Sequence, residues 1–378
     1  MSTSAAAPSL VPADLTPYDA LVLLSFGGPE GPDDVLPFLR RVTAGKGIPD
    51  ERLAEVGQHY ALFGGVSPIN AQNRALIAAL EAELEARGTP MTVHFANRNF
   101  EPLVADTLTR LAEAGHRRIL VVTTSAYSSY SSCRQYRENI ADAVTVAEDA
   151  TGVRLEVDKI RPYALHPGFV DANVAAVQTA VADAGTEHGT PALLFVTHSI
   201  PTAMDETSGP GDGEGSLYTR QHLWLAEAVT ARLAADLDVP DLSGELVFCS
   251  RSGPPQQPWL EPDVNDRLEE LAQEGVASVV LAPIGFVSDH MEVVYDLDTE
   301  AQASAKRLGL RVVRAATAGT DAGFVRGLVD LMLERAAEAR GEGGRGPDLA
   351  GAEAAPAVCR PGCCPNLRTE RPALCGSD

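Results

Sequence analysis

Short apolar runs recur along the chain, and longer stretches with helical periodicity, such as 70–87 and 217–237, separate them. The runs are nearly continuous in Val, Leu and Ile, which is the pattern of strands buried on both faces of a parallel sheet. Alternating strands and helices predict a doubly wound α/β fold. The predicted strands are 20–26, 92–97, 118–125, 154–160, 192–199, 245–250, 278–287 and 310–317.

The eight strands fall into two sets of four, so we expect two similar domains, each with a four-stranded parallel sheet flanked by helices. Two prolines in 161–168 interrupt the pattern and mark the boundary. The predicted organisation is a disordered start over 1–16, a first domain over 17–164, a second domain over 165–320, a helix over 321–339 that rejoins the first domain, and a linker with a cysteine-rich tail over 340–378.

Composition and charge limit the class of protein. The chain has 378 residues, 45% of them apolar, which is enough for a sizeable core. Its formal net charge of -22 argues against nucleic acid or an anionic membrane surface as the main partner. It has no run of 18 apolar residues, so no membrane-spanning helix is expected. The first residues lack the features of a signal peptide, which predicts a cytoplasmic protein with reduced cysteines.

His198 is the first candidate for chemistry, because it ends the apolar run "ALLFVTHS". The carboxyl ends of parallel strands face the ligand crevice in doubly wound sheets. A histidine at that place can act as a general acid or base or as a metal ligand. The alternative is a histidine that is only structural.

A set of carboxylates follows another apolar run, 278–287, in "SDHMEVVYDLDTE". Asp289 and Glu292 fit a capping box and predict a helix start. Glu292, Asp296 and Glu300 then follow one another at i, i+4 and i+8 along one face. This row is either a solvated helix face or a lining that suits a divalent cation.

The tail holds four of the six cysteines: Cys359, Cys363, Cys364 and Cys375. In a reducing compartment these residues are expected to bind metal or to stay idle rather than to form disulfides. Cys249 lies on an apolar strand and is expected to be a core residue. Cys133 lies in the hydroxyl-rich stretch "TSAYSSYSSCRQYREN".

Five motifs, in this order, resemble the ferrochelatase family, whose members insert Fe²⁺ into a porphyrin. They are "LLSFGGPEGPDDVLPFL", "HYALFGGVSPIN", "VTHSIP", "SRSGPPQQPWLEP" and "GFVSDHMEVVYDLD". The resemblance runs from about residue 19 to about residue 320. It is greatest for the coproporphyrin III branch, in the subset whose C-terminal extension carries a [2Fe–2S] cluster. Iron and coproporphyrin III are then the expected substrates.

The resemblance implies two Rossmann-like domains with a porphyrin cleft between them. It assigns catalysis and binding of the Fe²⁺ substrate to His198 and Glu292, and a route for Fe²⁺ to Asp296 and Glu300, on a helix that widens locally to π geometry. The substrate contacts that it implies are Phe26, His59, Tyr60, Ser67 and Tyr136. Phe26 stands where related enzymes often have a tyrosine, so it cannot ligate iron. His59 stands where an arginine is common, which removes one partner for the propionates.

For the cluster, the resemblance implies one ligand from the body of the protein and three from the tail. The expected set is Cys133, Cys359, Cys364 and Cys375, with Cys363 as the alternative. Four thiolates are what a [2Fe–2S] cluster needs.

Other functions stay open at this point. The nearest are insertion of iron into protoporphyrin IX and insertion of another metal such as cobalt. A tetrapyrrole or metal carrier without turnover is a different class, but it would not need a base facing a carboxylate. A redox protein in which the cluster is the function lacks a flavin or nicotinamide fingerprint. Transient contact with other haem-pathway enzymes is expected from the pathway alone.

Overall fold

The computed structural model describes residues 14–374 except 46, 186–188, 212, 238, 240, 241, 254, 255, 344, 347 and 350–354. Most of the predicted disordered start, and the predicted ligand Cys375, therefore lie outside the described residues. In the described part, no helix is long and apolar enough to cross a membrane.

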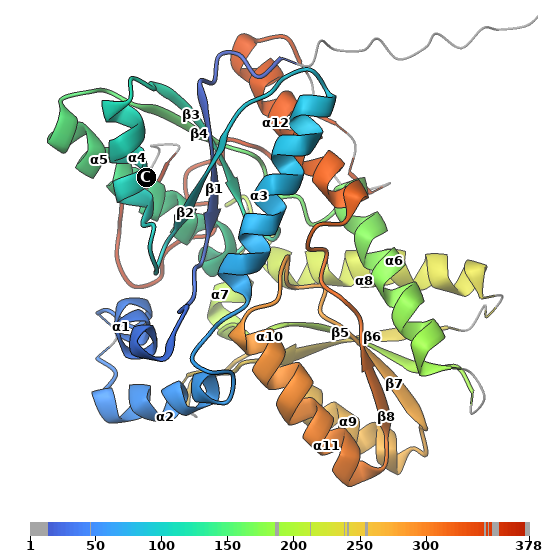
Figure 1. The fold of residues 1–378 in the computed structure, drawn as a ribbon. Coiled ribbons are helices and arrows are strands. Elements are labelled where there is room, and N and C mark those ends of the chain that lie inside the picture. The colour runs from blue at the N-terminus through green and yellow to red at the C-terminus, as the bar shows by residue number, and fades with distance from the viewer. Residues whose placement is uncertain are drawn as a thin grey trace, which may run out of the picture.

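The strands form two parallel sheets of four, as predicted (Figure 1). The first contains β1 (Ala20–Ser25), β2 (Val93–Asn97), β3 (Arg118–Thr123) and β4 (Glu156–Lys159), in the order β2-β1-β3-β4. The second contains β5 (Ala192–His198), β6 (Gly244–Cys249), β7 (Ser278–Ala282) and β8 (Arg311–Arg314), in the order β6-β5-β7-β8. The second sheet thus repeats the topology of the first. The domain boundaries given above stay predictions.

Helices cover both faces of each sheet. They are α1 (Pro32–Val42), α2 (Asp50–Ala61), α3 (Ile69–Ala86), α4 (Val104–Glu113), α5 (Gln135–Thr151), α6 (Pro167–Ala184), α7 (Thr202–Glu206), α8 (Leu217–Asp236), α9 (Val264–Gln273), α10 (Met291–Tyr295), α11 (Gln302–Leu308) and α12 (Ala322–Arg340). Two π-helical segments, η1 (Tyr130–Arg134) and η2 (Asp296–Ala301), precede α5 and α11.

Alternation along β1 explains why both faces of the sheet are buried. Leu21 and Leu23 point into one core, whereas Val22 and Leu24 point into another that is covered by α4 and α5. The first of these cores is continuous across both sheets, since it also contains Phe195 of β5 and residues of α3, α6, α8 and α12. The two domains therefore share apolar packing and support each other's position.

The strand order fixes where ligands can bind. In each sheet the second strand in the chain lies on one side of the first strand, and the third strand lies on its other side. A crevice therefore opens at the carboxyl ends of the two central strands. These strands are β1 and β3 in the first sheet and β5 and β7 in the second. Residues that follow them are placed together even though they are far apart in sequence.

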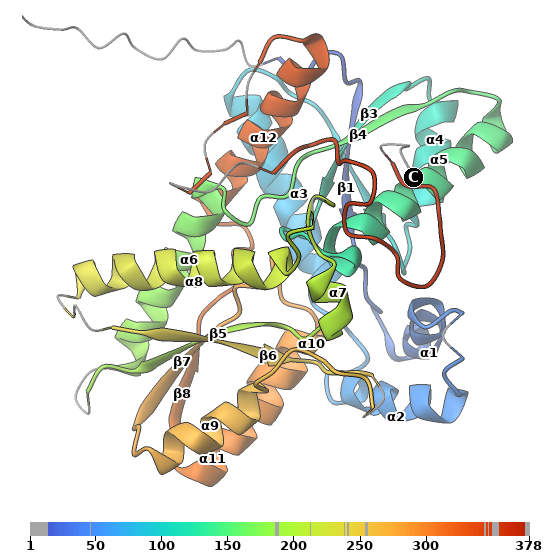
Figure 2. The same ribbon diagram turned by 180° about the vertical axis from the view of Figure 1, so that it is seen from behind.

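The tail lies against η1 and α5 of the first domain (Figure 2). Asn366 donates to the Tyr130 hydroxyl at 2.9 Å, and Arg134 donates to the Arg371 carbonyl at 3.1 Å. The backbone N–H of Leu374 donates to the Arg137 carbonyl at 2.9 Å. These contacts hold the tail next to Cys133.

Helix α8 of the second domain holds the segment that follows β3 in the first. The rings of Tyr127 and His222 stack with centroids 3.6 Å apart, and Gln221 accepts from the Ser128 N–H at 2.8 Å. His222 is fully buried, and its Nδ1 donates to the Tyr218 carbonyl at 2.7 Å. Burial lowers the pKa of His222 to about 3, although the bond to Tyr218 partly opposes this.

This buried histidine predicts a loss of stability in acid. Unfolded His222 binds a proton near its ordinary pKa of 6.5, but folded His222 does so only near 3, so stability should fall as pH drops through that window. A His222→Phe variant keeps an aromatic ring at this position, but that ring cannot bind a proton. Urea unfolding should show that the wild type loses up to about 1.4 kcal/mol per pH unit more than this variant. Equal pH slopes for the two proteins would contradict this.

Candidate active site

His198 and Glu292 lie next to each other in the second domain. His198 is the last residue of β5, and Glu292 lies in α10, which follows β7, the strand adjacent to β5. The His198 Nε2 lies 3.5 Å from the Glu292 Oε1, and both side chains keep access to solvent, at 30% and 48% exposure. The His198 Nδ1 donates to the Ser199 carbonyl, which leaves Nε2 to face the site.

The charges around His198 favour its protonated form. Burial alone would lower its pKa, but the Glu292 carboxylate, the Ser199 carbonyl and Asp296 together raise the pKa to about 9. The raised pKa favours the imidazolium form of His198 at neutral pH, and Glu292 contributes most to that rise.

The predicted capping box is wrong. Helix α10 begins at Met291, and its cap is His290, whose Nδ1 accepts from the Glu292 N–H at 3.2 Å. Asp289 instead pairs with Arg314 at 3.2 Å, because that guanidinium competes for the carboxylate. The cap fixes Glu292 in the first turn, opposite His198.

The carboxylate row lies on a helix that widens to π geometry at η2, as the family resemblance implied. Burial raises the pKa of Asp296 to about 7, even though the Ser250 hydroxyl donates to this carboxylate. The charges of Glu292 and Glu300 contribute to this raised value, so both carboxylates lie close enough to Asp296 to repel it. Carboxylate oxygens are the ligands that hard divalent cations prefer, but in the described residues these side chains are not arranged as a formed metal site.

His59 and Tyr60 of α2 reach this part of the second domain. The His59 ring stacks on Tyr295, with centroids 3.8 Å apart and planes 6° apart. Burial and then the Glu292 charge raise the pKa of the Tyr60 phenol. Both predicted contacts therefore lie beside the His198–Glu292 pair.

The other predicted substrate contacts are less open. Phe26 follows β1 and packs edge to face on Phe38, with centroids 6.1 Å apart. Ser67 is 4% exposed and fills the space where a side chain on Gly28 would be. Tyr136 is 5% exposed and belongs to the core beneath α4 and α5. Their contact with a substrate stays a prediction.

Arg98 is a candidate that the sequence reasoning missed. Its guanidinium lies 5.6 Å from the centre of the Phe26 ring and 4.5 Å from that of Tyr136. Its Nε donates to Asn139 at 2.7 Å, which fixes the side chain. The signal in the sequence was its place directly after β2, where parallel strands present their functional side chains.

Four buried thiols form a row of successive contacts in the folded chain. Cys133 of η1 hydrogen bonds with Cys359 of the tail, Cys359 with Cys363, and the sulfurs of Cys363 and Cys364 are 3.9 Å apart. In the described part of the chain, no three His, Cys, Asp or Glu side chains are arranged to hold a metal ion. Cys249 is a buried core residue, as predicted.

A buried cation faces these thiols. Lys159 is 6% exposed and donates to its neighbour's carbonyl, Ile160 O, at 2.7 Å. The hydrogen bond with Cys359 and burial raise the pKa of Cys133 well above its ordinary value, while Lys159 and Arg137 lower it. On balance the surroundings favour the protonated thiol of Cys133, and the positive charges of Lys159 and Arg137 oppose this only in part.

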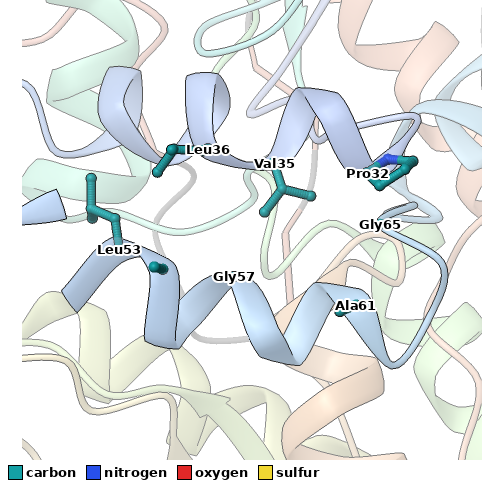
Figure 3. A pocket seen from close by; sticks show the side chains of 8 residues that line it. Pro32, Val35, Leu36, Leu53, Gly57, Ala61 and Gly65 are labelled. Carbon is teal, nitrogen blue, oxygen red and sulfur yellow. The ribbon is translucent and has the colours of Figure 1, made fainter. Parts of the chain in front are cut away.

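An apolar pocket of about 230 Å³ lies between α1 and α2, and neither His198 nor Glu292 is among the residues that line it (Figure 3). Its lining is Pro32, Val35, Leu36, Leu53, Ala54, Gly57, Ala61 and Gly65. None of these side chains can move a proton or bind a metal ion.

Comparison with known proteins adds to this geometry. The Ferrochelatase family model matches residues 18–336. A protein of Streptomyces coelicolor named coproporphyrin III ferrochelatase is 53% identical over 369 residues, which are 97% of this chain and 98% of that protein. A protein of Leifsonia xyli subsp. xyli with the same name is 49% identical over 377 residues, covering 95% and 94%. The solved structure of SirB from Bacillus subtilis with Fe³⁺ has a TM-score of 0.49 at 14% identity, covering 85% of this chain and 97% of that one.

The charge balance at His198 can be tested directly. Glu292→Gln removes the carboxylate that raises the pKa of His198, so the titration of this imidazole should move from about 9 toward neutral pH. Nitrogen NMR of the histidine ring measures it. Asp298→Asn is the matched control, because Asp298 is held by Arg314 at 2.6 Å. An unchanged pKa of His198 in Glu292→Gln would refute the electrostatic assignment.

Proposed function

This chain belongs to the ferrochelatase family, and we propose that it inserts Fe²⁺ into coproporphyrin III, releasing two protons, in haem biosynthesis. The observation that carries the proposal is the pairing of the His198 Nε2 with Glu292, beside a row of carboxylates. The names of the two similar bacterial proteins support coproporphyrin III as the porphyrin.

The charges suggest an order of events. Fe²⁺ that approaches Glu292 and Asp296 supplies positive charge there, so the imidazolium of His198 loses the interaction that holds its proton. The proton leaves, and the neutral Nε2 can then accept a pyrrole proton. The Nδ1 keeps its bond to the Ser199 carbonyl throughout, so the ring stays oriented.

Asp296 is suited to carry protons away. Its pKa of about 7 lets it gain or lose a proton near neutral pH, and Ser250 holds it in place. Glu300, farther along η2, provides the next carboxylate toward solvent. The proposed route for iron, through Asp296 and Glu300, uses the same groups in the opposite direction.

The macrocycle is placed by the aromatic residues around the pair. Tyr60 and Phe26 come from the first domain, and His198 and Glu292 come from the second. Coproporphyrin III carries four propionates, and Arg98 beside Phe26 offers a guanidinium for one of them. Position 59, where related enzymes often have an arginine, holds a histidine in this chain, so Arg98 supplies a guanidinium that position 59 lacks.

The proposed activity has a direct assay. We expect the anaerobic protein with Fe²⁺ and coproporphyrin III to give the absorption spectrum of the iron porphyrin. His198→Asn and Glu292→Gln should each lower kcat at least about a hundredfold, because proton transfer or metal handling is lost. His116→Asn, a remote histidine, should retain activity. Binding of coproporphyrin III without metalation by the wild type would indicate a carrier instead.

We also propose that the thiols hold a [2Fe–2S] cluster, which would supply electron-transfer or sensing chemistry. The donor chemistry fits, because thiolates are the ligands of such a cluster, Cys359 contacts both Cys133 and Cys363, and Lys159 supplies positive charge beside Cys133. In the described residues these thiols are paired with one another and are not gathered around a metal position. Cys375 is the expected fourth ligand. The contact between Cys359 and Cys363 favours Cys363 over Cys364, whose sulfur accepts a hydrogen bond from the Gly209 N–H at 3.4 Å.

Iron and sulfide content test the cluster. Protein purified anaerobically from iron-replete cells should be coloured and contain two iron and two sulfide per chain. Cys133→Ser should lose both, whereas Cys249→Ser, a change at a core cysteine, should keep them. A colourless wild-type protein without sulfide would contradict the proposal, and chelator treatment of the coloured protein should bleach it.

A further inference from the structure

Tyr218, in the first turn of α8, contacts the strand that carries His198. Its buried hydroxyl donates to the His198 carbonyl at 2.9 Å. The same oxygen lies 2.8 Å from the Thr197 hydroxyl, which must then be the donor, since a phenol has one proton. Tyr218 therefore fixes the backbone at the end of β5, from which the imidazole projects.

The tail reaches this tyrosine through the segment between α7 and α8. The N–H of Cys364 donates to the Gly209 carbonyl at 3.0 Å, and the N–H of Gly209 donates back to the Cys364 sulfur at 3.4 Å. The neighbouring Ser208 hydroxyl accepts from the Tyr218 N–H at 2.9 Å. Cys364 adopts a left-handed backbone with φ of 49°, which turns its sulfur toward Gly209.

A glycine allows the tail and the segment between α7 and α8 to approach each other closely. Gly211 has a φ of 81°, and a Cβ at that position would lie 2.9 Å from the Pro361 carbonyl. No side chain can enter there without moving the tail. The tail is therefore fitted to this segment rather than resting loosely on it.

A second path joins Cys133 to the first two turns of α8. Cys133 lies in η1, a few residues after Ser128, which is held by Gln221 at 2.8 Å. His222 stacks on Tyr127 and donates to the Tyr218 carbonyl at 2.7 Å. Both thiol-bearing segments thus converge on Tyr218.

We propose that Tyr218 is a positioning residue that links the cysteine-rich tail to His198. The tail contacts Gly209 and so fixes Ser208 and the first turn of α8. The Tyr218 hydroxyl, which projects from that turn, then fixes the backbone of His198 through its hydrogen bond. The inference rests on the proposed function of His198. It goes further by giving the tail an effect on turnover that does not need electron transfer to the substrate.

A double-mutant cycle on kcat tests the link. Tyr218→Phe keeps the ring and removes the bond to His198, so kcat for iron insertion should fall about fivefold, the effect of one ordinary hydrogen bond. KM for the porphyrin should stay nearly constant, because Tyr218 lies behind β5. Cys364→Ala should also lower kcat while the cluster absorption persists. In the Tyr218→Phe background Cys364→Ala should have no further effect.

The matched control is Tyr163→Phe. Tyr163 is also buried and donates to a strand-end carbonyl, Thr123 O, at 2.7 Å, but in the first sheet. The Tyr163→Phe substitution should leave kcat unchanged, and Cys364→Ala should lower kcat equally with and without it. If Tyr218→Phe does not fold, Ser208→Ala breaks the same link and should give the same non-additivity.

Additive effects of Tyr218→Phe and Cys364→Ala, or unchanged kcat in both variants, would overturn the inference. A higher KM for the porphyrin with unchanged kcat in these variants would also overturn it. Wild-type protein that inserts no iron would defeat the proposed function as well, so the two failures are distinguishable.

Discussion

The adjacency of β5 and β7 is the constraint on which the rest of the site depends. The chain crosses from one side of β5 to the other, so the residues that end β5 and those that follow β7 share one crevice. His198 and Glu292 meet there at 3.5 Å although 94 positions separate them in the numbering of the sequence. Their pairing then sets the proton state of the imidazole, and the π-helical segment behind Glu292 sets the spacing of the other carboxylates.

Much of this arrangement was predictable from the sequence. Apolar runs without alternation indicate strands buried on both faces, and all eight predicted strands are present in the two sheets. The position of His198 at a strand end indicated its place in the crevice, since topology alone puts strand ends there. The ferrochelatase resemblance added the partner Glu292 and the widening at η2, which no periodicity reveals.

The features of the site that could not be predicted from the sequence depend on contacts between groups that are distant in the chain. Asp289 has the spacing of a helix cap, but Arg314 of β8 takes its carboxylate and His290 caps the helix. Arg98 becomes a candidate only because folding lays it over the Phe26 ring. Contacts of the tail likewise depend on the full fold. They bring Cys364 to the segment before α8 and leave Cys363 beside Cys359.

The central claim is that the His198–Glu292 pair faces the porphyrin during metalation. The most direct measurement is a crystal structure of the anaerobic protein with metal-free coproporphyrin III. The account predicts a macrocycle between the two domains, with the His198 Nε2 and a Glu292 oxygen directed at its nitrogens from the same crevice and the Tyr60 ring nearby. A macrocycle seated elsewhere, for example in the apolar pocket between α1 and α2, with His198 and Glu292 still paired and remote from it, would contradict the account.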